Sequence, residues 1–119
     1  MSRNEPDGAE LEALLARCAA GDRAALATLY ARVAPILLAV LMRILRRRDV
    51  AEDALQDVFV SVWQRAHQFD PIRGRPLAWL VSMARYRAID LQRAARGEIS
   101  TDEVIRNIYH RANVSIPGR

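Results

Sequence analysis

The sequence contains no lysine. All 18 basic residues are arginines, which stand against 14 acidic residues and give the 119-residue chain a formal charge of +4. Arginine offers a planar fork of donors that suits phosphates and bases, and it also stacks on rings. A GC-rich genome favours arginine over lysine just as well, so the bias by itself raises the expectation of a nucleic-acid partner only slightly. The length suits one small domain with a single core.

Cysteine and histidine are also scarce. Cys18 is the single cysteine, so the sequence offers neither an intrachain disulfide nor a cysteine-based metal site. It falls in an apolar helical pattern, where we expect a small buried hydrophobic side chain. His67 and His110 are far apart and belong to no ligand-spaced cluster. We therefore predict no metal and no cofactor.

Long apolar runs are missing as well. The apolar stretch 34–45 is too short to span a bilayer and is interrupted by Arg43. The first residues show no signal-peptide pattern. We therefore expect no membrane association and a cytoplasmic location.

Catalytic motifs are absent too. The sequence shows no paired histidine and carboxylate, no nucleophile elbow and no glycine-rich phosphate loop. Ser61 and Ser82 fall inside predicted helices and lack an obvious base. We predict no catalytic residues and no enzymatic activity.

The chain is instead rich in helical periodicity. The spacing of apolar residues predicts helices over 9–20, 23–47, 50–66, 76–96 and 101–112. No segment alternates as a strand does, and there is no internal repeat. We therefore predict an all-α fold, a compact bundle of about four to five helices, after a flexible N-terminus at residues 1–8.

Helix-start signals support these boundaries. Three pairs of residues have the spacing of a capping box: Asp7 with Glu10, Asp49 with Glu52, and Ser100 with Glu103. Asp22 is a natural N-cap for the second helix, and Pro76 suits the first position of the fourth. Pro35 falls inside the second helix, where we expect a kink or a local break.

The third predicted helix, 50–66, is acidic on the side away from its apolar half. Carboxylates and amides share that outer face: Glu52, Asp53, Gln56, Asp57 and Gln64. For an isolated helix an ordinary solvated face is the favoured interpretation. The same face also complements a basic groove or helix on a partner protein. The pattern leaves both interpretations open.

The fourth predicted helix is basic and carries exposed rings. Trp79, Met83 and Tyr86 project almost opposite to its apolar stripe, and the flanking sector holds Arg85, Ile89, Gln92, Arg93 and Arg96. Rings beside a row of arginines match a platform for single-stranded nucleic acid. Alternatively, Trp79 and Met83 pack against another helix, such as the first or the last. The arginines near the helix end also interact favourably with its dipole.

The loop before this helix, 68–75, contains Arg73 and Arg75 in a tight turn around Gly74. Backbone amides and arginines in such a turn can cradle an extruded base or a phosphate. A capped helix–helix connection explains the same proline and glycine residues without any ligand.

Three segments together resemble region 2 of bacterial RNA polymerase sigma factors of the extracytoplasmic-function (ECF) class. They read AALATLYARVAPILLAVLMRIL, DVAEDALQDVFVSVWQRAHQFDP and RGRPLAWLVSMARYRAIDLQRAAR. The resemblance covers roughly residues 11–96. It implies a sigma region 2 helical domain over 9–96, followed by a linker with a short C-terminal helix over 97–119. The domain that reads the −35 element in such factors, region 4, is not found in this sequence.

The resemblance implies a transcription initiation factor domain that binds core RNA polymerase and recognises and melts the promoter −10 element. The polymerase clamp helices would be contacted by Asp53, Gln56 and Asp57. The loop 69–75 would receive a base flipped from the non-template strand. The implied DNA contacts are Arg73, Arg75, Trp79, Arg85, Tyr86, Arg87, Gln92, Arg93 and Arg96.

Tyr86 stands where the family often has asparagine, which leaves the specificity for one base open. An anti-sigma factor is a further expected partner. The alternative function is a sigma-like interaction module that sequesters polymerase or an anti-sigma factor without reading DNA.

Overall fold

The computed structural model describes residues 5–97, which form four α-helices and one short 3-10 helix. The elements are α1 (Gly8–Ala19), α2 (Arg23–Leu45), α3 (Arg48–Arg65), η1 (Ala66–Gln68) and α4 (Pro76–Ala95). Within 5–97 there is no strand, so the predicted all-α fold is confirmed. The predicted helix at 101–112 and its capping box lie outside the described residues.

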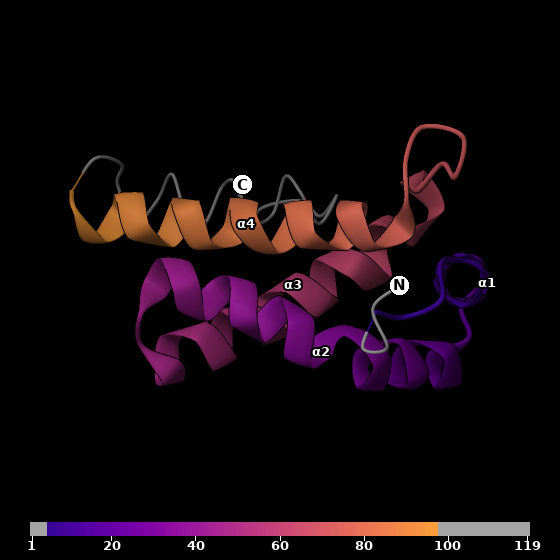
Figure 1. Ribbon diagram of the computed structural model, residues 1–119, viewed down its shortest axis with the longest axis horizontal. Coiled ribbons are helices and arrows are strands. Elements are labelled where there is room, and N and C mark those ends of the chain that lie inside the picture. The colour runs from indigo at the N-terminus through magenta and orange to yellow at the C-terminus, as the bar shows by residue number, and fades with distance from the viewer. Residues whose placement is uncertain (1–4, 98–119) are drawn as a thin grey trace, which may run out of the picture.

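Helix α2 forms the centre of the bundle. It packs against α1, α3 and α4, and α4 lies across the top of the molecule in Figure 1. The largest fully buried side chains come from all four helices and belong to one core: Leu11, Leu15, Leu29, Val33, Leu37, Leu41, Val58, Val62 and Leu80. Cys18 is buried in the same core, as its apolar surroundings predicted. The bundle therefore has a single hydrophobic core.

Helices α1 and α2 begin at the predicted caps. Asp7 accepts a hydrogen bond from the backbone N–H of Ala9 at 3.1 Å. Asp22 accepts from the N–H groups at the start of α2, which satisfies donors that have no partner inside the helix. Glu10 does not complete the predicted capping box. It accepts instead from Nε of Arg32 at 3.1 Å and so ties α1 to α2.

Helix α3 begins two residues before its predicted start, and the predicted Asp49 capping box is wrong. The N-cap is Arg47, whose side chain makes no capping bond. Asp49 lies inside the first turn and pairs with Arg47, with Nη2 and Oδ2 2.8 Å apart. The physical reason is Arg46, whose left-handed backbone (φ 62°) ends α2 abruptly and lets α3 start at once.

Pro35 does not interrupt α2, so the predicted local break is wrong. The helix is continuous from residue 23 to 45. Its ribbon changes direction part-way along in Figure 1, which fits the kink that a proline causes by removing a backbone donor.

Taken whole, α2 is also longer and more apolar than the stretch 34–45 suggested. Among residues 5–97 it alone has the length and composition to cross a membrane, with a mean hydropathy of 1.9. A third of that apolar window is buried inside the bundle. The core helix of a globular domain meets the same criterion, so this is weak evidence for a membrane span.

Candidate functional site

The outer face of α3 presents the predicted polar side chains. Asp53 and Gln56 are exposed, and Asp57 is half-buried. Val60 lies among them and is 54 % exposed, although it is a large apolar residue. On a helical wheel at about 100° per residue it falls opposite the buried stripe, so the sequence pattern contained this signal. This face combines carboxylates and an amide with one apolar contact.

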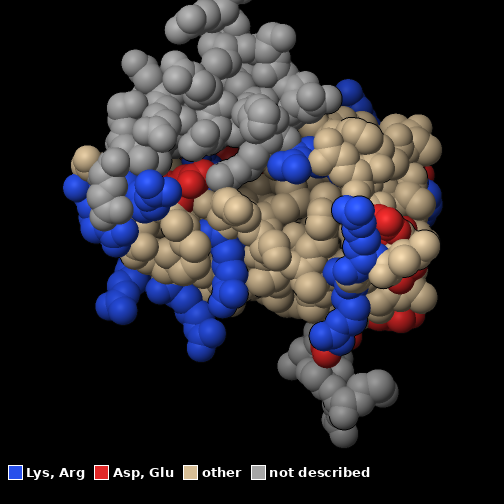
Figure 2. All heavy atoms as spheres, turned by 90° about the horizontal axis from the view of Figure 1, so that it is seen from above, with Lys and Arg blue, Asp and Glu red and all other residues tan. Residues whose placement is uncertain are grey.

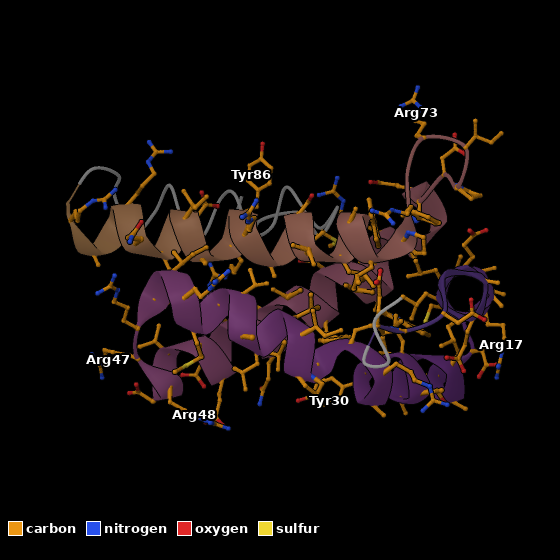
Figure 3. All side chains as sticks on the ribbon, viewed as in Figure 1. Arg17, Tyr30, Arg47, Arg48, Arg73 and Tyr86 are labelled. Carbon is orange, nitrogen blue, oxygen red and sulfur yellow. The ribbon has the colours of Figure 1, made fainter. Side chains whose placement is uncertain are left out.

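The upper face of α4 carries the predicted basic surface. Arg85, Arg93 and Arg96 are exposed, and Tyr86 is 63 % exposed and points away from the bundle in Figure 3. Ile89 on the same face is 44 % exposed. Figure 2 looks down on this side and shows arginine side chains spread over it. A ring and several guanidinium groups thus lie on one helix face.

Trp79 lies against the preceding loop. Its ring is half-buried, with its centroid 5.5 Å from that of Phe69 and the two planes tilted by 57°. Such a tilted pair is a favourable aromatic geometry. Trp79 and Met83 are both half-buried and pack against the core, which supports the alternative that they lie inside the bundle; the ring contact of Trp79 is with Phe69 of the loop and not with the first or last helix.

The loop 69–75 encloses one side of a cavity of about 350 Å³. Asp70 organises the turn, because its side chain accepts from the N–H of Ile72 and its carbonyl accepts from the N–H of Arg73, both at 3.0 Å. Arg73 is 88 % exposed and extends from the loop in Figure 3. Ile72, which sequence reasoning missed, is 93 % exposed. The cavity is lined by Gln68, Phe69, Asp70, Arg73, Gly74, Arg75, Ala78, Trp79 and Ser82.

A second cavity of about 370 Å³ lies between α3 and α4. It is lined by Asp57, Val58, Ser61, Arg65, Trp79, Ser82, Met83, Tyr86 and Arg87. Trp79 and Ser82 line both cavities, so the two hollows adjoin each other. Sequence periodicity could not predict this cavity, because it depends on how two helices pack. Its size falls in the range of small-molecule sites, and rings and hydroxyl groups share its wall.

Two residues predicted for different partners bind each other. Both Nη2 and Nε of Arg87 donate to Oδ2 of Asp57, at 2.8 and 3.2 Å, and only 11 % of the Arg87 side chain is exposed. Nη1 of Arg87 is buried without a hydrogen-bond partner in a residue that lines the cavity between α3 and α4. Arg87 is thus a link between the two faces and not an exposed arginine of α4.

Gln92 also has a partner inside the bundle. It is half-buried, and its Nε2 donates to the carbonyl of Ile44 at 3.4 Å. This contact holds the C-terminal part of α4 against the end of α2. Gln92 therefore has a structural contact in addition to its predicted role at DNA.

Comparison with known proteins identifies the fold. Residues 29–98 match the family described as sigma-70 region 2. The ECF RNA polymerase sigma factor SigK of Mycobacterium tuberculosis H37Rv is 40 % identical over 81 residues, which cover 68 % of this chain and 43 % of that protein. SigK of Mycobacterium ulcerans is 38 % identical over 85 residues, covering 71 % of this chain and 46 % of that protein.

The chain therefore belongs to the sigma-70 region 2 family, as a region 2 domain of the ECF class of sigma factors. The resemblance found from the three sequence segments is confirmed. The chain spans less than half the length of the curated relatives it matches.

Proposed function

We propose that this domain binds core RNA polymerase through α3 and recognises and melts the promoter −10 element through α4 and the loop 69–75. The observation that carries the proposal is the pair of adjoining cavities that share Trp79: Arg73 and Arg75 of the loop line one, and Tyr86 of α4 lines the other. The relatives are named RNA polymerase sigma factors, which supports both halves of the proposal.

The polymerase contact is proposed for the outer face of α3. Asp53 and Gln56 are exposed there beside Val60, a combination that complements a basic helix with an apolar contact on a partner protein. Asp57 borders this face but already pairs with Arg87. Asp57 would therefore contribute both to docking and to the packing of α3 against α4.

The DNA contact is proposed for the loop and the upper face of α4. A base that leaves the stack loses pairing and stacking energy, which a cavity with aromatic walls and nearby guanidinium groups can offset. The cavity beside the loop offers Trp79 and Phe69 as rings and Arg73 and Arg75 as cations. Further contacts along the strand are proposed for Arg85, Tyr86, Gln92, Arg93 and Arg96.

Melting on this surface uses binding energy alone, so we propose that the domain is not an enzyme and needs no ATP hydrolysis. A role in transcription supports a cytoplasmic location. An anti-sigma factor is a further proposed partner, which would compete with polymerase for the outer face of α3.

Fluorescence anisotropy tests the DNA half of the proposal. Single strands that the 119-residue chain selects from a random pool serve as labelled probes. The wild-type chain and the Arg93→Ala/Arg96→Ala variant are titrated against them in parallel. We expect the variant to bind more weakly and the slope of log affinity against log salt to fall by about 0.7 for each lost phosphate contact on a single strand.

Arg23→Ala provides the matched control, because Arg23 is an exposed arginine at the start of α2 and belongs to neither α4 nor the loop 69–75. An unchanged affinity and salt dependence in the double variant would refute the assignment of DNA reading to α4. A wild-type chain that binds core polymerase but no single strand would instead favour a sigma-like module that sequesters its partners.

A further inference from the structure

A second group of arginines lies where α2 turns into α3. Arg43, Arg46, Arg47 and Arg48 are all exposed, and we call them the α2–α3 corner. Figure 3 shows Arg47 and Arg48 at the end of the molecule opposite to Arg73. The corner is thus separate from the loop 69–75 and its cavity.

The corner adjoins the C-terminal end of α4. The hydrogen bond from Gln92 to the carbonyl of Ile44 joins the two helix ends, and Arg93 and Arg96 follow directly on α4. In Figure 2 arginine side chains crowd this end of the molecule. The basic surface of α4 therefore continues past the end of the helix onto a different part of the chain.

The charge of the corner is only partly neutralised. Arg47 pairs with Asp49 and Arg48 with Glu52, and all four side chains are more than half exposed. Such exposed pairs are weak and screened by salt, so the arginines can exchange partners at little cost. Within residues 5–97, Arg43 and Arg46 have no carboxylate at ion-pair distance.

Arg46 also holds an unfavourable backbone conformation. Its φ of 62° and ψ of 8° are left-handed, a position at helix ends that glycine or asparagine normally occupies. The other described residues with positive φ are glycines, Gly21 and Gly97. An arginine that keeps a conformation suited to glycine is an outlier of the kind that marks functional positions.

The composition of the corner distinguishes between partners. The large apolar side chains that the described residues expose all lie elsewhere: Tyr30, Val60, Ile72, Tyr86 and Ile89. A single strand needs rings on which its bases can stack, and a protein partner needs an apolar centre. A surface of guanidinium groups without either fits the phosphates of a duplex, whose contacts position a protein without reading sequence.

We propose that the α2–α3 corner binds the phosphate backbone of double-stranded DNA that adjoins the single strand held on α4. The inference rests on the proposed function of α4. Helix α4 has 20 residues and is therefore about 30 Å long. A single strand that follows α4 would reach the corner at the C-terminal end of the helix, and the duplex would begin there. The corner would anchor the boundary between paired and unpaired DNA at one end of the melted segment.

The test uses an Arg43→Ala/Arg46→Gly variant of the 119-residue chain. Glycine suits the positive φ of Arg46, so this substitution removes a guanidinium group and relieves the backbone at the same position. Anisotropy is measured with four probes: the selected single strand alone, a plain duplex, and two forks that carry the duplex on the 5′ or the 3′ side of the strand. Arg23→Ala is again the control, since Arg23 is exposed at the opposite end of α2.

We expect the variant to lose about fivefold in affinity for one fork, and the salt slope for that fork to fall by about 0.9 for each lost phosphate. Binding of the single strand alone and the behaviour of Arg23→Ala should not change. Equal losses on the single strand and the fork, or no loss on either fork, would overturn the inference. Loss of core polymerase binding in a pull-down without loss on the forks would identify the corner as a protein contact instead.

The two proposals fail in different ways. If the wild-type chain binds no single strand, the proposed function of α4 is wrong. The plain duplex still tests the corner in that case, because the variant must then bind the duplex more weakly than the wild type does.

Discussion

At the scale of single residues, Arg87 differs from the exposed arginines of α4 in its environment. It is 11 % exposed and donates twice to Asp57, which is 45 % exposed. Removing one partner of an ion pair leaves the other charge behind, and this costs most where that charge is buried. Removing Asp57 should therefore cost more stability than removing Arg87.

This asymmetry gives the first prediction. Asp57→Asn leaves a buried guanidinium without its counter-charge, whereas Arg87→Met leaves a carboxylate that water still reaches. We expect Asp57→Asn to destabilise the domain more than Arg87→Met, with a coupling energy of about 1–2 kcal/mol between the two substitutions. Urea unfolding of the wild type, both single variants and the double variant measures it. Additive effects of the two substitutions would contradict the prediction.

At the scale of elements, Asp22 joins α1 to α2. It caps α2 and also pairs with Arg17 of α1, where Nη2 and Oδ2 are 2.8 Å apart. The hydrogen bond from Arg17 and those from the helix N-terminus hold the pKa of Asp22 below its usual value of 3.8. A carboxylate with a lowered pKa stabilises the fold above its unfolded pKa, and this contribution is lost as the pH falls through the folded pKa.

Asp22→Asn separates the two roles of this residue. Asparagine caps a helix about as well as aspartate, but it carries no charge. We expect the melting temperature of the variant to lie close to that of the wild type near neutral pH. As the pH drops below about 4, the melting temperature of the variant should fall less than that of the wild type. Asp22→Ala, which removes the cap as well, should melt lower at every pH. Thermal unfolding followed by circular dichroism over this pH range measures all three proteins, and parallel curves for wild type and Asp22→Asn would contradict the prediction.

The outer face of α3 is the second element with a direct test. An Asp57→Arg substitution could not separate an effect on docking from an effect on stability, because it would place two cations against each other at Arg87. Asp53→Arg combined with Gln56→Arg avoids this, since both side chains are exposed and neither belongs to the Asp57–Arg87 pair. We expect loss of core polymerase binding in a pull-down with unchanged helicity and unfolding midpoint.

Glu12→Arg on α1 is the control for this test, because Glu12 is an exposed acid on another helix. It reverses a charge without touching α3. If the α3 variant still binds polymerase, or if both variants lose polymerase binding equally, the outer face of α3 is not the docking surface.

At the scale of the whole molecule, the sequence predicts the helices and the core well, because apolar periodicity and burial are the same physical fact. The four described helices and their central core follow from that pattern. The start of α3 was missed because it depends on the left-handed conformation of Arg46, which is not a usual residue there. The Asp57–Arg87 pair was missed because it joins positions 30 residues apart, which no local pattern relates.

The cavity between α3 and α4 belongs to the same class of features. Its walls come from two helices, and its shape is set by how closely they pack. The sequence pattern placed Trp79, Met83 and Tyr86 opposite the apolar stripe of α4, but only Tyr86 is exposed, and Trp79 and Met83 pack against the core. It could not show that they surround a hollow together with Ser61 and Arg87.

Cys18 gives the bundle a built-in reporter of its own motion. The thiol is 2 % exposed on α1, and burial raises its pKa, with Asp22 adding to the effect and Arg17 opposing it. A thiol reagent can reach it only after α1 leaves the other helices, so the rate of labelling counts those openings. Because the chain has one cysteine, the signal has a single source. Labelling rates measured with and without DNA or polymerase would therefore report how strongly each proposed partner stabilises the closed bundle.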